Sequence, residues 1–309
     1  MGAVREVPFA ERAQAVASAY DAAGTSSCLV VCATHEEIDR ATEAIRKCRK
    51  TRGELGPSAS LARHVSLNWT AAQKADLRNL RPGQLLGFHR KVKGIAKNET
   101  AEVVRSGPSS AVVRKADGTE HTLTSNHAAS FDVLEARTIE LSAGDRLLLT
   151  GNRRAAGLRV TNGELVTVAG IDTAGQVHLD DGRTLPTSYR NFTHGYAVTA
   201  HRSQGKTVDS VIISADGMQQ ELFYVAASRG RQAVTVITSD QERLRKTVAQ
   251  SAARTSASEL LRSKGTILRR GTCRGLALAR EMVRRAAEFV QQVANTHRKE
   301  RTYEHGISR

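Results

Sequence analysis

The chain has 309 residues, which is enough for one large or two modest domains with a substantial core. Four cysteines are too few to form a disulfide scaffold in a chain of this size, and no apolar stretch has the length or the flanks of a signal peptide or a bilayer span. The net charge of +15 favours an anionic partner, with nucleic acid first and an acidic membrane surface second. We therefore expect a cytoplasmic protein that has no membrane partner.

The first predicted unit is a helix, a strand and a second helix in that order. Helical apolar spacing over residues 9–22 leads to the apolar run Ser-Cys-Leu-Val-Val-Cys-Ala, which is typical of a buried strand. Thr34 then stands at a helix N-cap position, and the following helix extends to about Arg49. This order indicates a parallel α/β sheet. Cys28 and Cys32 share one face of the strand, but no second pair of ligands accompanies them, so we expect core packing and no metal.

The middle of the chain has a different texture. Thr70 is predicted to cap a short helix over residues 71–80 that ends before Pro82. From Gln84 to about Leu185, short β-like runs alternate with turn signals such as Ala-Asp-Gly, Thr-Asn-Gly and Asp-Asp-Gly. This pattern predicts small antiparallel sheets or a barrel, inserted within the α/β domain.

The α/β texture returns at Tyr196. Strands are predicted up to Ala200 and over 208–214 and 233–238, with helices over about 218–229, behind Asp240 as N-cap, and over 276–293. The predicted fold is a RecA-like parallel sheet domain interrupted by an antiparallel β insertion, with a helical C-terminal extension. Its predicted parts are 1–82 and 191–252 for the sheet domain, 83–190 for the insertion, and 253–309 for the extension. The extension has 13 Lys and Arg against 5 Asp and Glu, which suits either a solvated basic helix or a nucleic-acid contact.

Ala200–Thr207 includes a Gly-Lys-Thr that fits a relaxed nucleotide-binding P-loop. A phosphate cradle needs a Gly-rich loop followed by a helix whose N-terminal amides face the phosphates. Here the β-branched run that starts at Val208 predicts a strand instead. A stand-alone nucleotide hydrolase that uses Ala200–Thr207 is therefore the least favoured of the alternatives.

Three ordered segments resemble motifs of superfamily-one DNA helicases. Tyr196–Asp209, which begins Tyr-Ala-Val-Thr-Ala-His-Arg-Ser-Gln-Gly, resembles motif V. Phe223–Arg231, which includes Tyr-Val-Ala-Ala-Ser-Arg, resembles motif VI, and Leu29–Glu37 continuing to Arg46 resembles motif IV. Gly-Asp-Arg-Leu-Leu-Leu at 144–149 with Asn-Gly-Glu at 162–164 resembles the β insertion of RecD-like helicases. Together they resemble the C-terminal, second RecA-like portion of conjugative relaxase–helicases of the TraI/TrwC type, over about residues 9–247.

The resemblance implies a role for each matching residue. Arg229 would reach the γ-phosphate of ATP bound on a partner domain, since a planar, permanent cation suits the charge of a transferring phosphoryl group. Arg231 would share that role or form a structural pair, and Arg229 itself could be a surface salt bridge. Gln204, Gly205 and Lys206 would face the nucleotide, and a helix cap is the alternative role of Thr34. The DNA-binding candidates are Thr34, His35, Thr199, His201 and Ser203.

The same resemblance implies shared ATP and Mg²⁺, single-stranded DNA as partner, and a 5′-3′ type of helicase. The sequence shows no first RecA-like domain with its P-loop and Asp-Glu pair, and no relaxase residues. We therefore expect little ATP hydrolysis by the chain alone. It would be a truncated portion or would act with a separate chain that carries the first domain. A non-catalytic DNA-binding accessory module or a truncated remnant is the alternative.

Overall fold

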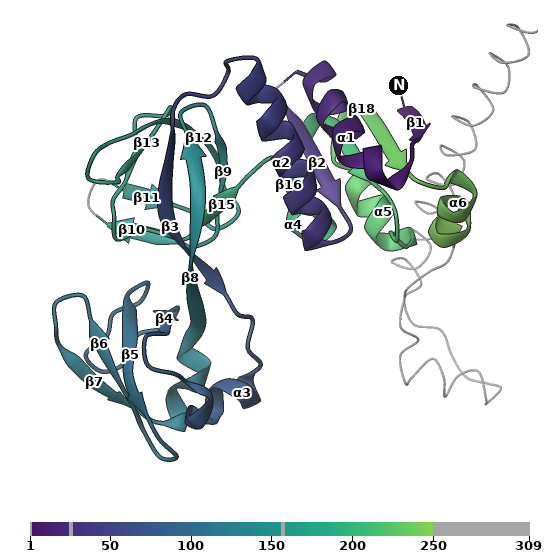
Figure 1. The fold of residues 1–309 in the computed structure, drawn as a ribbon. Helices are drawn as coiled ribbons and strands as arrows, with labels where there is room; N and C mark the ends of the chain where they lie inside the picture. The colour runs from purple at the N-terminus through teal and green to yellow at the C-terminus, as the bar shows by residue number, and fades with distance from the viewer. Residues whose placement is uncertain (1, 25–26, 156–157, 250–309) are drawn as a thin grey trace, which may run out of the picture. The chain divides into compact units, whose positions relative to one another are not determined.

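The computed structural model describes residues 2–24, 27–155 and 158–249, which form two compact units (Figure 1). Unit 1 contains the described residues up to Thr51 and from Tyr196 onwards, and unit 2 is Arg52–Gly195. The expected α/β class, with a parallel sheet interrupted by antiparallel sheets, is confirmed. The predicted helix over 276–293, the basic extension 253–309 and Cys273 lie outside the described residues.

Unit 1 contains a five-stranded sheet in the order β1-β18-β17-β2-β16, and every neighbouring pair in it is parallel. Its strands are β1 (Gly2–Glu6), β2 (Cys28–Cys32), β16 (Ala197–Thr199), β17 (Val208–Ser214) and β18 (Gly230–Thr238). All five residues of β2 are buried, as their unbroken apolar run predicts for a central strand. The edge strand β1 was not predicted, because a five-residue segment with one β-branched residue carries little strand signal.

The helices of unit 1 pack around this sheet. They are α1 (Arg12–Ala22), α2 (His35–Thr51), α4 (Ala200–Ser203), α5 (Gln220–Ala227) and α6 (Gln241–Ala249), with a 3₁₀ turn η1 (Phe9–Glu11) before α1. One hydrophobic core contains Tyr20 of α1, Ile45 of α2 and alternate residues of the strands, among them Cys32, Ile212 and Ile237. Since alternate residues of a strand share a face, α1 and α2 cover the same face of the sheet.

The predicted helix caps are present. The Thr34 hydroxyl accepts a hydrogen bond from the Glu37 amide at 3.2 Å, and the Asp240 carboxylate accepts one from the Arg243 amide at 2.8 Å. Thr70 forms a reciprocal capping box with Gln73.

The helix behind Thr70 is shorter than predicted. It runs as α3 (Ala71–Ala75) and is followed by a 3₁₀ turn, η2 (Leu77–Asn79). The chain leaves the helix at Asp76, whose extended backbone and carboxylate, bonded to the Arg78 amide, start the new turn.

Unit 2 is built from two antiparallel sheets and a separate hairpin. The six-stranded sheet has the order β3-β8-β4-β5-β6-β7, the five-stranded sheet has the order β14-β13-β12-β9-β15, and β10 pairs with β11. The long strand β8 contributes Phe131 and Val133 to one hydrophobic core, and Ile139 and Leu141 to the other. The elements are β3 (Ser58–Ser66), β4 (Leu85–Phe88), β5 (Thr100–Ser106), β6 (Ala111–Lys115), β7 (Glu120–Leu123), η3 (Ser125–Ser130), β8 (Phe131–Ser142), β9 (Arg146–Leu149), β10 (Arg153–Ala155), β11 (Leu158–Val160), β12 (Leu165–Ile171), β13 (Val177–Leu179), β14 (Thr184–Leu185) and β15 (Phe192–His194).

The borders between the units differ from the predicted positions 82/83 and 190/191. They fall at 51/52 and 195/196, so residues 52–82 belong to the inserted unit. The reason is β3, which pairs with β8 along its whole length, from Ser58 opposite Ser142 to Ser66 opposite Leu134. Its sequence, Ser-Ala-Ser-Leu-Ala-Arg-His-Val-Ser, is rich in small and polar residues and gives a weak strand signal.

Candidate functional site at the edges of the parallel sheet

The motif V segment runs from the carboxyl ends of the parallel strands, the carboxyl edge of the sheet, to their amino ends, the amino edge. Thr199 pairs with Cys32 at the carboxyl ends of β16 and β2, whereas Val208 pairs with Gly230 at the amino ends of β17 and β18. The strand predicted to reach Ala200 ends one residue earlier, because the Thr199 hydroxyl caps α4 by accepting from the Arg202 amide at 3.3 Å. The predicted site residues therefore divide between the two edges.

The Gly-Lys-Thr turn lies at the amino edge. Gly205 has φ +80°, a backbone conformation that favours glycine, and the Lys206 amide donates to the Ser203 carbonyl at 3.0 Å. Gln204, just before this turn, is exposed. Strand β17 begins directly after Thr207, as the β-branched run predicted, and α4 precedes the turn. No helix follows Gly-Lys-Thr to point its amides at a phosphate.

Arg229 stands beside this turn, between α5 and β18. Its Nε donates to the Val225 carbonyl at 2.9 Å, its Nη1 to the Lys206 carbonyl at 3.3 Å, and its Nη2 to the Ser228 hydroxyl at 2.7 Å. All three acceptors are neutral, and within the described residues no carboxylate lies at ion-pair distance from Arg229. The guanidinium is therefore oriented without being neutralised, and its planar fork can still meet an anion.

Arg231 has a different environment. Its Nη2 lies 2.9 Å from the Asp209 carboxylate, and 61% of its side chain is exposed. The charge of Arg231 is thus compensated by a neighbour on β17. This contact is the structural pair that the sequence left open as one of two roles for Arg231.

The DNA-binding candidates gather towards the carboxyl edge, with one exception. Thr34 and His35 follow β2 and are exposed, and His201 is exposed on α4. Ser203 does not suit the expected DNA contact. It is fully buried, and its hydroxyl donates to the Ala200 carbonyl at 2.6 Å. The short helix α4, which the sequence did not predict, turns this side chain inward.

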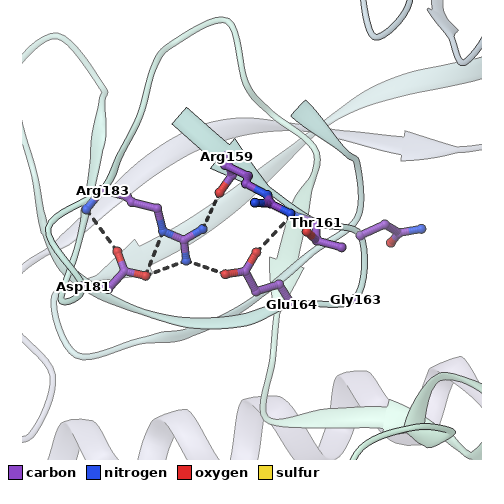
Figure 2. Close-up of a pocket in the computed structure, with 7 residues that line it drawn as sticks. Arg159, Thr161, Gly163, Glu164, Asp181 and Arg183 are labelled. Atoms are coloured by element: carbon purple, nitrogen blue, oxygen red, sulfur yellow. Dashed lines mark hydrogen bonds and ion pairs between the residues drawn. The ribbon is translucent and has the colours of Figure 1, made fainter. Parts of the chain in front are cut away.

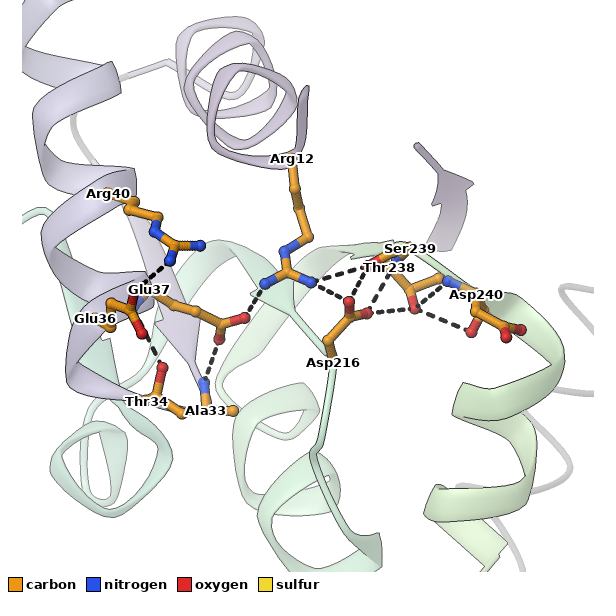
Figure 3. Close-up of polar contacts among 10 residues, drawn as sticks. All are labelled: Arg12, Ala33, Thr34, Glu36, Glu37, Arg40, Asp216, Thr238, Ser239 and Asp240. Carbon is orange, nitrogen blue, oxygen red and sulfur yellow. Dashed lines mark hydrogen bonds and ion pairs between the residues drawn. The ribbon is translucent and has the colours of Figure 1, made fainter. Parts of the chain in front are cut away.

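A buried ion cluster closes another part of the carboxyl edge (Figure 3). Arg12 of α1 is 4% exposed and bonds both Glu37 of α2 and Asp216, which follows β17. Asp216 also accepts from the Thr238 hydroxyl at 2.7 Å and the Ser239 amide at 2.9 Å. We call Arg12, Glu37 and Asp216 the Arg12 clamp. It ties the ends of β17 and β18 to the end of β2, because the Glu37 carboxylate also accepts from the Ala33 amide at 3.2 Å.

The clamp shifts the acidity of its members. Burial raises the pKa of Glu37, although the charge of Arg12 acts against it. Burial also acts to raise the pKa of Asp216, but hydrogen bonds from Ser239 and Thr238, with the charge of Arg12, outweigh it and the pKa is lowered. Burial, with Glu37 nearby, raises the pKa of Cys32, which keeps the thiol protonated and suits its place in the core. The Arg12 clamp could not be predicted from the sequence, because its three members are far apart in the chain.

The amino edge suits phosphate better than it suits a metal. The uncompensated charge of Arg229 fits an anionic phosphoryl group, whereas Asp209 at the same edge is paired with Arg231. In the part of the chain that the structure describes, no group of three or more His, Cys, Asp or Glu could hold a metal ion.

Known proteins resemble this chain over the segment that holds the amino-edge residues. Residues 194–237, which hold the Gly-Lys-Thr turn and Arg229, match the family described as UvrD-like helicase C-terminal domain. The chain is 33% identical over 101 residues to the conjugal transfer protein TraA of Rhizobium radiobacter. It is 34% identical over 95 residues to a probable conjugal transfer protein TraA of Sinorhizobium fredii (strain NBRC 101917 / NGR234). Each match covers 29% of this chain and 9% of the TraA protein.

Solved helicase structures show a distant likeness. Pif1 helicase from Bacteroides, in complex with ADP-AlF3 and ssDNA, is 14% identical with a TM-score of 0.28, covering 82% of this chain and 50% of that one. Pif1 helicase from Candida albicans is 13% identical with a TM-score of 0.26, covering 77% and 50%.

The resemblance to the C-terminal helicase portion of conjugative relaxase–helicases is confirmed. None of the described helices has the length and apolarity needed to span a membrane.

Proposed function

We propose that the chain is the second motor domain of an ATP-dependent single-stranded DNA translocase or helicase of conjugative plasmid transfer. ATP and Mg²⁺ would be held mainly by a first RecA-like domain, either in the same longer protein or on a separate chain. Arg229 would complete that site as an arginine finger. The family match over 194–237 and the TraA relatives support the proposal.

The observation that carries the proposal is the contrast between Arg229 and Arg231. Both lie at the amino edge of the sheet, but within the part of the chain that the structure describes only Arg231 has a carboxylate partner. Three hydrogen bonds to neutral acceptors hold Arg229 beside Lys206 of the Gly-Lys-Thr turn. A pre-oriented, uncompensated guanidinium is what a transferring phosphoryl group requires, because negative charge is spread over its oxygens in the transition state.

The DNA-binding part of the proposal uses the carboxyl edge near β2 and β16. Thr34 and His35 follow β2, Thr199 ends β16, and His201 lies on α4 just beyond it. Hydroxyl groups and the amino-terminal end of α2 suit contacts to a phosphate of the strand. Motif V links this edge to the Gly-Lys-Thr turn through one continuous backbone segment. That segment would couple DNA binding at one edge to nucleotide binding at the other.

The test is an ATPase assay with single-stranded DNA, using the chain alone and the chain mixed with a first RecA-like domain. We expect hydrolysis only in the mixture. Arg229→Ala should lower its kcat by about 10³-fold or more, the usual contribution of an arginine finger. Arg229→Lys should have a kcat close to that of Arg229→Ala, because a lysine cannot reproduce the planar guanidinium fork.

Arg231→Ala is the matched control, since it removes the same charge from the same edge but from a compensated pair. It should change kcat by no more than a few-fold. Hydrolysis by the chain alone that is lost in Lys206→Ala would instead support a stand-alone nucleotide hydrolase. DNA binding that never couples to ATP, with either preparation, would support a non-catalytic accessory module.

A further inference from the structure

The hairpin β10–β11 in unit 2 carries an unusual concentration of positive charge. Arg153 and Arg154 lie on β10 and Arg159 lies on β11, with Arg154 directly opposite Arg159 in the register. Arg154 and Arg159 are both exposed. Like charges directly opposite each other across two strands destabilise the pairing, so this arrangement favours an outside anion. We call these three residues the arginine hairpin.

The nearby carboxylates are already used (Figure 2). Glu164 and Asp181 both form ion pairs with Arg183, whose guanidinium also donates to the Arg159 carbonyl at 2.7 Å. These bonds lower the pKa of both acids, so both stay ionised and paired. Arg153 donates to the neutral Ser188 hydroxyl at 2.9 Å. Among the described residues, no carboxylate lies at ion-pair distance from any member of the arginine hairpin.

An open depression of about 700 Å³ lies beside the hairpin, and it includes Arg159, Arg183 and the turn 161–163. The amides of this turn are not available to a ligand. Thr161 donates to Glu164 at 3.0 Å, Asn162 to the Asn152 side chain at 2.8 Å, and Gly163 to the Leu149 carbonyl at 2.8 Å. An isolated phosphate would therefore find no ring of backbone donors here. Arg154 and Arg159 lie on one face of the hairpin, opposite each other, and such a cross-strand pair of guanidinium groups suits neighbouring phosphates of an extended polyanion better.

We propose that the arginine hairpin binds the phosphodiester backbone of single-stranded DNA without reading its bases. The depression is lined by no aromatic side chain, so bases would have no ring to stack on, and binding rests on charge. The Arg183 network, one guanidinium with two carboxylates, supports the hairpin through the bond from Arg183 to the Arg159 carbonyl. This binding surface lies in unit 2, needs no nucleotide, and goes beyond the motor role proposed for unit 1.

The experiment measures binding of the full chain to fluorescently labelled oligo-dT by anisotropy, over a series of salt concentrations and without ATP. The double variant Arg154→Ala with Arg159→Ala should bind roughly 3- to 10-fold more weakly at moderate salt. The slope of log affinity against log salt should decrease by about 1.4, since each single-strand phosphate contact contributes about 0.7.

A double variant with the same charge loss is the control. Arg114→Ala with Arg137→Ala removes two exposed arginines of unit 2 that have carboxylate partners, Glu120 and Glu135. For this control, the slope of log affinity against log salt should decrease by clearly less than for the Arg154→Ala and Arg159→Ala double variant. Equal slopes for the two double variants would overturn the proposal, because the loss would then reflect total charge alone.

Charge reversal gives a second, independent readout. Arg159→Glu places a carboxylate opposite Arg154, so the melting temperature should hold or rise while the affinity for DNA falls. A fall in melting temperature together with unchanged affinity would contradict the proposal. Oligo-dA should behave like oligo-dT, and a hairpin-dependent preference between them would rule out contact through the backbone alone. Because the assay contains no ATP and no first motor domain, its result is separate from the test of Arg229.

Discussion

Arg12 and Arg229 are both held by several hydrogen bonds, but their surroundings differ in charge. Arg12 is buried between two carboxylates, whereas Arg229 bonds only neutral acceptors within the described residues. A buried charge needs a partner within the fold, whereas an exposed or half-exposed charge is stabilised by water until a ligand binds it. Neighbouring carboxylates thus separate the structural arginines of this chain from those available for binding.

The first prediction concerns the Arg12 clamp. Arg12→Ala leaves Glu37 and Asp216 without their shared cation, so unit 1 should lose about 3 kcal/mol of stability. Hydrogen exchange of the β2 amides should report the loss directly. The single tryptophan, Trp69, packs in the core of unit 2, so its fluorescence is a poor probe of this change.

Arg40→Ala serves as the control for Arg12→Ala, because Arg40 pairs with Glu36 on the exposed side of α2. It should change stability by about 0.5 kcal/mol or less. Similar losses for the two variants would show that Arg12 acts through packing near Phe9, which both guanidinium groups contact, and not through the buried charges.

The second prediction is a pH dependence. The folded pKa of Asp216 is below its ordinary value of 3.8, so its stabilisation is complete above that value and is lost as pH falls through the lowered pKa. Asp216→Asn should therefore be less stable than the unaltered chain at pH 7. That difference should narrow as the pH falls below about 4. Exchange protection of unit 1 between pH 3 and 7 measures this.

Glu37 should behave in the opposite way, because its pKa in the fold is raised above 4.5. Ionisation of Glu37 costs stability as pH rises through the raised pKa, so the stability of Glu37→Gln relative to the unaltered chain should increase with pH. If the two variants changed in the same direction with pH, this account of the clamp would be wrong.

At the scale of elements, short segments between regular strands decide where the site residues point. The motif V segment leaves β16 through α4, turns at Gly205 and enters β17 at Val208. The turn at Gly205 brings the Lys206 carbonyl to Arg229. The helix α4 faces His201 outward and Ser203 inward. Few hydrogen bonds hold this segment in place. A single substitution that strains its backbone should therefore lower stability and speed up amide exchange.

The third prediction tests the Gly205 turn. No atom lies within 4 Å of a Cβ placed on Gly205, so the cost of Gly205→Ala comes from its φ of +80° alone and should be about 1–2 kcal/mol. The loss should appear as faster amide exchange at the start of β17. Gly170→Ala adds the same methyl group in open space without a positive φ, and its stability should stay constant or increase slightly. Equal losses would show that backbone strain is not the cause.

At the scale of the whole molecule, unit 2 is an insertion whose ends meet in unit 1. Helix α2 ends at Thr51 and β16 begins at Ala197, and the two elements are in contact. The Arg49 guanidinium donates to the Tyr196 hydroxyl at 2.9 Å, next to both ends. Unit 1 therefore has a closed core without contribution from the inserted residues.

The fourth prediction follows from this closure. Replacing residues 52–195 with a short Gly/Ser linker should leave unit 1 folded, because loop-closure entropy changes slowly with loop length. Circular dichroism and exchange protection of β17 measure the outcome. The shortened chain should also lose the part of its DNA affinity that depends on the arginine hairpin. A collapsed or aggregated product would show that unit 1 depends on unit 2.

Much of unit 1 could be predicted from the sequence, because its signals are local. The apolar run of β2, the caps Thr34 and Asp240, and the β-branched run of β17 each specify an element within a few residues. The β3 strand and the true border at Arg52 could not be predicted, since β3 is defined by pairing with β8 some 75 positions away. Thr70 was predicted as a cap correctly, but Asp76 ended the helix early through a bond that propensity does not describe.

The sequence by itself determined the α/β class, the order of the helicase-like motifs and the strand that follows Gly-Lys-Thr. These properties depend on residue type and spacing along the chain. Only the tertiary structure decided that Ser203 is buried, that Arg231 but not Arg229 has a carboxylate partner among the described residues, and that Arg154 opposes Arg159. Each of these depends on which charge or hydroxyl group comes within hydrogen-bonding distance after folding. Coulomb and hydrogen-bond energies fall off over a few ångströms in space, and sequence separation does not measure that distance.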